Sequence, residues 1–251
     1  MFKIFFISIL LIASFIFFAF ATDGIDAQKY DGLWFMGFNL TNPLFKGEKG
    51  LQVRKAVNYA IRREKIALQI ASSNIVPDCY IPYGMEGYQS LDPVSYNIAL
   101  AKQLLKDAGY SMQDKRLKKV RIFHTNGIIT KLIAKEIQEN LKNIGIKVIL
   151  EGINFSKQKA WVKKLKKKDF DLFLMGYKAD IPEDVLTFLN PIFYSVGDAN
   201  FTGLNDKVVD DLLDSLEYAI DSQVRLKKIK HISEILMKKK VIIGLFYIPV
   251  L

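Results

Sequence analysis

Cysteine and histidine are scarce in this sequence of 251 residues, which has one cysteine, Cys79, and two histidines, His124 and His231. A single cysteine cannot form a disulfide within the chain, and it excludes the CxxC motifs of redox and zinc sites. With two histidines, a zinc site would need mostly carboxylate ligands, which is unusual. We therefore predict neither a structural metal nor a cofactor.

Motifs of known catalytic centres are also lacking, since the sequence contains no GxSxG, HExxH, P-loop or dinucleotide-binding motif. Two carboxylate pairs, Asp210 with Asp211 and Asp169 with Asp171, come nearest to an acid–base arrangement. Adjacent residues of a helix point to different faces, and neither pair has a nucleophile or a metal ligand close by in the sequence. We predict that the protein is not an enzyme.

Basic residues are in excess, with 36 Lys and Arg against 26 Asp and Glu and a net charge of +10. One interpretation is a nucleic-acid or anionic-membrane partner. The other is a solvated, lysine-rich surface, in which residues 163–168 (KKLKKK) lie on the outer face of a helix that buries Trp161, Val162 and Leu165. Base-stacking aromatics are not interleaved with the basic residues, so we predict no nucleic-acid partner.

A long apolar run stands near the beginning of the sequence, where residues 4–21 follow Lys3 and contain two serines as their only polar residues. The run ends in Ala-Phe-Ala, the small-x-small pattern that signal peptidase accepts. We expect residues 1–21 to be a signal peptide that directs export to the periplasm or the extracellular space, and residues 22–251 to form one domain. Because the run is about the shortest that spans a bilayer, an uncleaved membrane anchor is the alternative.

Strand-like and helical patterns alternate through the middle of the sequence. Strand-like runs at residues 120–125, 146–150 and 170–175 are separated by helical patterns at 129–141 and 156–167. This alternation predicts parallel strands with right-handed crossovers. We therefore expect an α/β fold with a mostly parallel central sheet flanked by helices. Its other elements are helices at 48–61, 64–71, 92–109, from 205 or 206 onward, and 221–239, with strands at 33–40 and 241–250.

An aromatic residue and an acid follow the third strand-like run, in the segment GYKADIP at residues 176–182. In open α/β sheets, ligands bind beyond the carboxyl ends of the strands. Tyr177 and Asp180 would then lie at a cleft, where a carboxylate beside an aromatic ring can bind an ammonium group. The alternative is that Asp180 opens the next turn, with Pro182 at the start of a helix.

Six stretches of the sequence, in order over residues 35–250, form a recognisable series: FNLTNPLFKGEKGLQVRKAVNYAIRREKI, SLDPVSYNIALAKQLLKDAGY, LIAKEIQENLKNIGIKVIL, DFDLFLMGYKADIP, NFTGLNDKVVDDLLDSL and VIIGLFYIP. They resemble, in the same order, motifs of the family 5 extracellular solute-binding proteins. Members of that family are the peptide, dipeptide and nickel receptors of ABC importers.

The resemblance also implies positions for a ligand. Asp180 matches the acid that faces the inter-lobe cleft in that family and, in peptide receptors, pairs with the amino terminus of the ligand. Tyr177 matches an aromatic that is usually Trp, and Leu174 stands where some oligopeptide receptors place a basic group. Asn39, from the first stretch, and His124, at the end of a predicted strand, are further ligand-binding candidates. A core or surface histidine is the alternative for His124.

The resemblance covers the second of the two lobes that the family has, which implies a single lobe of the type II periplasmic-binding-protein fold. It also implies a substrate-binding component of an ABC importer for peptides or related small solutes. The permease subunits and a separate first-lobe chain are then the candidate protein partners. The alternative is an interaction module that binds no ligand, either degenerate or tethered to a membrane through residues 4–21.

Overall fold

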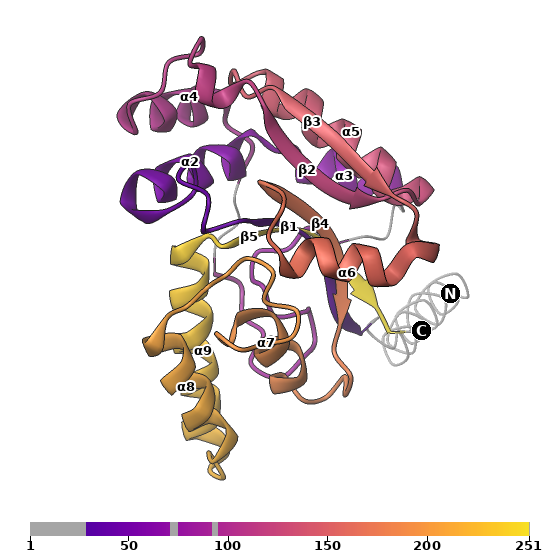
Figure 1. Cartoon of the computed structure of the whole chain (residues 1–251). Coiled ribbons are helices and arrows are strands. Elements are labelled where there is room, and N and C mark those ends of the chain that lie inside the picture. The colour runs from indigo at the N-terminus through magenta and orange to yellow at the C-terminus, as the bar shows by residue number, and fades with distance from the viewer. Residues whose placement is uncertain (1–28, 71–74, 92–94, 251) are drawn as a thin grey trace, which may run out of the picture.

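The computed structural model describes residues 29–70, 75–91 and 95–250, so the signal peptide predicted at residues 1–21 lies outside the described part. Figure 1 shows helices packed on both sides of a central sheet. In chain order the elements are β1 (Tyr30–Phe38), α2 (Gly47–Ala60), α3 (Arg63–Ile70), α4 (Ile98–Asp107), η1 (Lys115–Leu117), β2 (Val120–Thr125), α5 (Ile128–Lys142), β3 (Val148–Ile153), η2 (Phe155–Lys157), α6 (Gln158–Lys166), β4 (Leu172–Lys178), α7 (Leu186–Phe193), α8 (Lys207–Glu217), α9 (Ser222–Lys239) and β5 (Ile242–Pro249).

Within the described ranges, five strands form one sheet in the order β3-β2-β4-β1-β5. β2 pairs in parallel with both β3 and β4, as the alternation of strands and helices predicts. β1 pairs antiparallel with both β4 and β5, so the sheet is mixed rather than mostly parallel. The predicted α/β class is confirmed. The sequence does not predict the direction of β1 and β5, because a buried apolar strand has the same composition in a parallel and in an antiparallel pair.

Side chains of the central strands alternate between two hydrophobic cores, one on each face of the sheet. In β1, Phe35 belongs to one core and Met36 to the other, and Phe173 and Leu174 divide in the same way in β4. Helices α6 to α9 contribute to the first core and helices α2 to α5 to the second. Burial of both faces accounts for the nearly continuous apolar sequence of β4.

The starts of three helices depend on side-chain caps. Asp206 caps α8 and Asp221 caps α9, each carboxylate accepting hydrogen bonds from backbone N–H groups of the first turn. The helix expected to open at residues 92–93 begins instead at Ile98. Asn97 supplies the acceptor that this first turn needs, because its side chain accepts a hydrogen bond from a backbone N–H. Residues 92–94 lie outside the described part.

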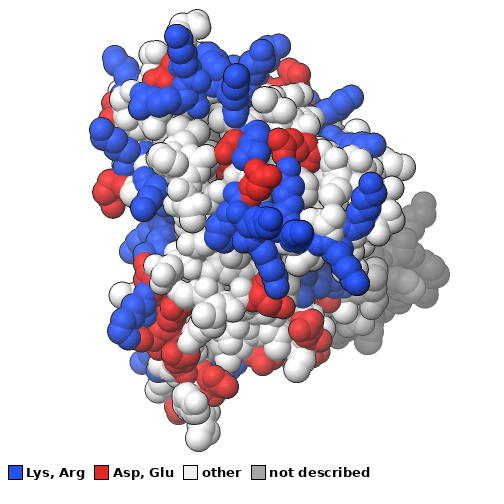
Figure 2. All heavy atoms as spheres, viewed as in Figure 1, with Lys and Arg blue, Asp and Glu red and all other residues white. Residues whose placement is uncertain are grey.

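Charge is distributed unevenly over the surface, with Lys and Arg gathered over α6 and its surroundings and acidic side chains over α8 (Figure 2). On α6, Leu165 is buried and Trp161 packs edge-on against Phe201, while Lys164 pairs with Glu151 at 2.6 Å. Lys163 and Lys166 are exposed on the outer face of the helix, whereas Lys168, after its end, donates to the carbonyls of Asn200 and Phe201 at 3.4 and 3.3 Å. Within the described ranges, no helix combines the length and the apolar character that crossing a membrane requires.

Candidate functional site

The strands β2, β3 and β4 end at one edge of the sheet, which we call the carboxyl edge. Because β1 is antiparallel to β4 and β5, β1 begins and β5 ends at the same edge. Tyr30 accordingly pairs with Pro249, and the backbone N–H of Val250 donates to the carbonyl of Lys29 at 2.9 Å. The arrowheads of β4 and β5 lie close together in Figure 1. Ligands of open α/β sheets bind beyond such an edge, which makes it the candidate site.

Large apolar side chains stand exposed just after the strands that end at the carboxyl edge. Ile128 follows β2 and is 81% exposed, Phe155 follows β3 and is 57% exposed, and Ile181 follows β4 and is 53% exposed. Val250, after β5, is also exposed. Exposed apolar side chains that recur at one place mark a surface for interaction, because water solvates them poorly. The carboxyl edge therefore combines strand ends with an apolar surface.

Asp180 lies at this edge, two residues after β4, and its side chain is exposed. It has neither a hydrogen bond nor an ion pair with any residue of the part of the chain that the structure describes. The sequence offered Asp180 an alternative role at the start of the next helix. Asp184 has that role instead, because its carboxylate accepts a hydrogen bond from the backbone N–H of Leu186 at 3.0 Å. The carboxylate of Asp180 is thus accessible to a ligand.

The nearest lysine in the sequence is occupied elsewhere. Lys178 reaches the buried carboxylate of Asp31 on β1 at 3.1 Å, and it also donates to the carbonyl of Pro249 at 3.3 Å. These contacts join the three strands β4, β1 and β5 at the carboxyl edge. The ammonium group of Lys178 therefore pairs with Asp31 and not with Asp180.

Tyr177 is half-buried, and its ring packs edge-on against Phe188 of α7 with 6.1 Å between ring centroids. Burial raises the pKa of Tyr177 to about 12, and the negative charges of Asp180 and Asp198 add to the shift. The phenol is therefore neutral at physiological pH and carries a hydroxyl group that can donate or accept a hydrogen bond. The charges of Asp180 and Asp198 thus both influence the phenol of Tyr177 electrostatically. Negative charge near an aromatic ring favours the binding of an organic cation.

Asp198 is absent from the residues that the sequence predicts, and it stands 18 positions after Asp180 in the loop that follows α7. The loop is shaped by Asn200, whose amide donates to the carbonyls of Tyr194 and Leu204 at 2.9 and 2.7 Å. The amide oxygen of Asn200 accepts from the hydroxyl of Thr202 at 2.9 Å. No local pattern in the sequence indicates that Asp198 comes within electrostatic reach of Tyr177, because the path of the loop depends on these contacts of Asn200.

The site chemistry is anionic. Over the described ranges, no group of three or more His, Cys, Asp or Glu side chains is arranged to hold a metal ion. Asp180 and Asp198 are both exposed acids, and Asp198 also lacks a hydrogen-bond or ion-pair partner among the described residues. An exposed carboxylate of this kind can bind an ammonium group by charge-assisted hydrogen bonds.

Asn39 lies apart from Asp180, whereas His124 belongs to the strand β2 that ends at the carboxyl edge, with its side chain buried. Asn39 follows the end of β1, at the edge opposite the carboxyl edge, where its amide donates to the carbonyls of Lys168 and Phe170 at 3.0 and 2.9 Å. His124 is the next-to-last residue of β2 and is buried, with its Nδ1 atom 2.6 Å from the carbonyl oxygen of Thr125. Both side chains serve packing and backbone bonding in this structure.

Comparison with known proteins relates most of the chain to one group. A family model described as bacterial extracellular solute-binding proteins, family 5 Middle, matches residues 9–200. The dipeptide-binding protein DppE of Bacillus subtilis (strain 168) is 25% identical over 234 residues, which make up 90% of this chain and 42% of DppE. The glutathione-binding protein GsiB of Salmonella choleraesuis (strain SC-B67) is 27% identical over 212 residues, 82% of this chain and 40% of GsiB.

A solved structure gives the same result for the fold. DppA, an ABC transporter-associated periplasmic binding protein from Helicobacter pylori in complex with the peptide STSA, superposes with a TM-score of 0.77 at 24% sequence identity. The superposition covers 88% of this chain and 43% of DppA. The chain therefore spans less than half the length of the proteins it matches.

Proposed function

Because this chain belongs to the bacterial extracellular solute-binding proteins of family 5, we propose that it binds peptides or related small solutes for an ABC importer. The names of the relatives support a peptide-like solute, since DppE is a dipeptide-binding protein and GsiB a glutathione-binding protein. Both names describe binding proteins, so an interaction module without a ligand gains no support. We likewise infer a binding role without catalysis.

The observation that carries this proposal is the unpaired carboxylate of Asp180 at the carboxyl edge, beside the ring of Tyr177. The amino terminus of a peptide is an ammonium group that both Asp180 and Asp198 attract. The ring of Tyr177 would offer apolar contact, and its hydroxyl a further hydrogen bond. We restrict the proposed site to these three residues, because the polar atoms of Asn39 are engaged at the opposite edge.

The first lobe of the family is the proposed cover of this site. The exposed apolar residues Ile128, Phe155 and Ile181 surround the strand ends, and the chain spans 42% of DppE. A solute held at the carboxyl edge of this lobe alone would be contacted from one side, so its affinity would be low. We propose that a first lobe and the permease subunits act together with this lobe, after export directed by residues 1–21.

The test is a calorimetric titration of the full-length chain with trialanine and with N-acetyl-trialanine. We expect the free amine to bind about tenfold more tightly than the acetylated peptide, and Asp180→Asn to weaken trialanine binding by about the same factor. Glu139→Gln, which neutralises an exposed acid on α5, is the matched control and should leave binding unchanged. Equal binding of both peptides, or equal binding by Asp180→Asn and the natural protein, would remove Asp180 from the site.

A further inference from the structure

A hollow of about 700 Å³ lies between helices α2, α4 and α9, and we call it the helical hollow. Its wall includes Lys240, which precedes β5, and the first residue of β5 pairs with Gly37 near the end of β1. The helical hollow is therefore near the edge of the sheet opposite the carboxyl edge. Its volume is typical of sites for small organic ligands.

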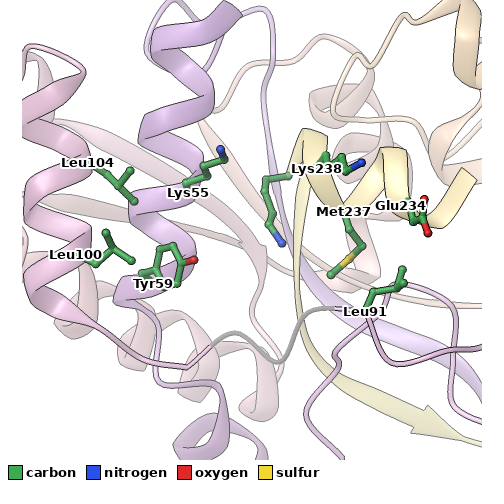
Figure 3. A pocket seen from close by; sticks show the side chains of 9 residues that line it. Lys55, Tyr59, Leu91, Leu100, Leu104, Glu234, Met237 and Lys238 are labelled. Carbon is green, nitrogen blue, oxygen red and sulfur yellow. The ribbon is translucent and has the colours of Figure 1, made fainter. Parts of the chain in front are cut away.

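One part of the helical hollow is apolar. Leu100 and Leu104 face it from α4, and Met237 from α9, with Leu91 on the same side as α9 (Figure 3). Leu100 is 37% exposed although it lies on the side of α4 that faces other helices. This wall offers an apolar chain a surface of leucine and methionine side chains. Methionine adapts well to ligands of variable shape.

The other part of the helical hollow is cationic. The amine of Lys55 and the hydroxyl of Tyr59 point into it from α2, as Figure 3 shows. Lys55 and Lys238 have no hydrogen-bond or ion-pair partner within the described part of the chain. The described lining residues include three lysines and one glutamate, Glu234, so the local charge favours an anion.

A small enclosed cavity of about 10 Å³ adjoins the helical hollow, since Met237 and Lys240 line both. Asn58 also lines this inner cavity, and its buried Nδ2 atom has no hydrogen-bond partner among the described residues. A volume of this size matches about one water molecule. A donor that is buried and unsatisfied beside a ligand-sized hollow indicates a place for a bound oxygen atom.

The backbone at Lys240 supports a functional role. Lys240 ends α9 in the left-handed conformation, with φ of 47°, where glycine or asparagine is usual. The side chain of a lysine adds strain there that glycine would avoid. Strained residues of this kind cluster at binding sites, and the buried Lys240 lies between the hollow and the inner cavity.

We propose that the helical hollow binds a small amphiphilic carboxylate, separate from the solute at the carboxyl edge. The carboxylate would lie near the amines of Lys55 and Lys240, and its apolar chain would pack against Leu100, Leu104 and Met237. Charge complementarity selects an anion, and the leucine wall selects an alkyl chain over a purely polar anion.

The experiment is an NMR titration of the full-length chain labelled with ¹³C at the methionine methyl groups, with octanoate as the probe. We expect the Met237 signal, assigned with Met237→Leu, to move saturably while the signal of Met175 on β4 stays in place. Lys55→Met should weaken octanoate binding at least tenfold. Lys102→Met, which removes an exposed lysine of helix α4 outside the hollow, should leave octanoate binding unchanged.

A second variant keeps the test independent of Lys55. Leu100→Glu places an acid in the partly exposed apolar wall and should also abolish octanoate binding. The proposal is overturned if octanoate leaves the Met237 signal in place, if Lys55→Met binds octanoate as well as the natural protein does, or if octyltrimethylammonium moves the signal equally. Asp180→Asn should bind octanoate normally, so failure here and failure of the peptide site are distinguishable.

Discussion

The ion pair between Lys178 and Asp31 allows a direct test of whether Asp180 is free. The ammonium of Lys178 lies 3.1 Å from Asp31 Oδ2, with the two side chains 36% and 6% exposed. The other oxygen, Asp31 Oδ1, is buried and has no hydrogen-bond partner in the part of the chain that the structure describes. Lys178→Met would therefore leave a buried carboxylate without any side-chain partner.

Removing one member of a fully buried ion pair costs about 3–5 kcal/mol, and the partial exposure of Lys178 reduces this to about 2 kcal/mol. We expect Lys178→Met to lower the free energy of unfolding by that amount. Asp31→Asn should relieve much of the loss when it is combined with Lys178→Met, because the buried charge is then gone. A coupling energy of about 1–2 kcal/mol between the two positions is the expected result.

Urea unfolding of the single and double variants measures these free energies, with unchanged m-values as the sign that the unfolding transition is the same. The matched cycle combines Lys178→Met with Asp180→Asn and should give a coupling energy near zero. A coupling to Asp180 larger than the coupling to Asp31 would show that the lysine neutralises Asp180 in solution. The carboxylate would then be unavailable to a ligand, and the reasoning for the peptide site would fail.

Three further predictions concern contacts elsewhere in the fold. The buried guanidinium of Arg54 donates to backbone carbonyls before α2 and at the end of α9, so Arg54→Met should lower the free energy of urea unfolding by about 3 kcal/mol. Burial raises the pKa of Asp206, but hydrogen bonds from Lys239 and from the backbone of α8 outweigh it and hold the pKa below 3.8. This stabilisation is present above about pH 4 and is lost as the pH falls through the folded-state pKa, so thermal melting of Asp206→Asn should depend less on pH in that acid range. Gly37→Ala would place a methyl group 2.2 Å from the ring of Phe173 and should lower the melting temperature, with a loss of about 2 kcal/mol.

The comparison of Asp180 with Asn39 shows how far the sequence predicts the site. Both residues are polar and follow an apolar strand, so a rule based on strand ends selects both. Asp180 follows β4, whose direction parallel to β2 is predictable from the alternation β2-α5-β3-α6-β4. Asn39 follows β1, which is antiparallel to β4 and therefore ends at the other edge. The missing piece of information is strand direction, which neither composition nor periodicity encodes.

Asp198 illustrates a second kind of information that local patterns lack. Its electrostatic influence on Tyr177 depends on the path of a loop that Asn200 closes by contacts with Tyr194 and Leu204. These contacts are specific to the folded chain, and a polar loop sequence is compatible with many paths. The strand end alone suggested Asp180 for the proposed site, whereas adding Asp198 to the proposal required the tertiary structure.

The pair of carboxylates also bears on how a basic protein can select an ammonium group. The net charge of +10 repels cations at long range, but at physiological ionic strength that field decays over about 8 Å. Lys178, the lysine nearest in sequence, is occupied by Asp31. A zwitterionic peptide has no net charge and feels little of the remaining field. Its amino group would therefore be recognised at contact distance by Asp180 and Asp198, and the global charge would neither supply nor prevent that recognition.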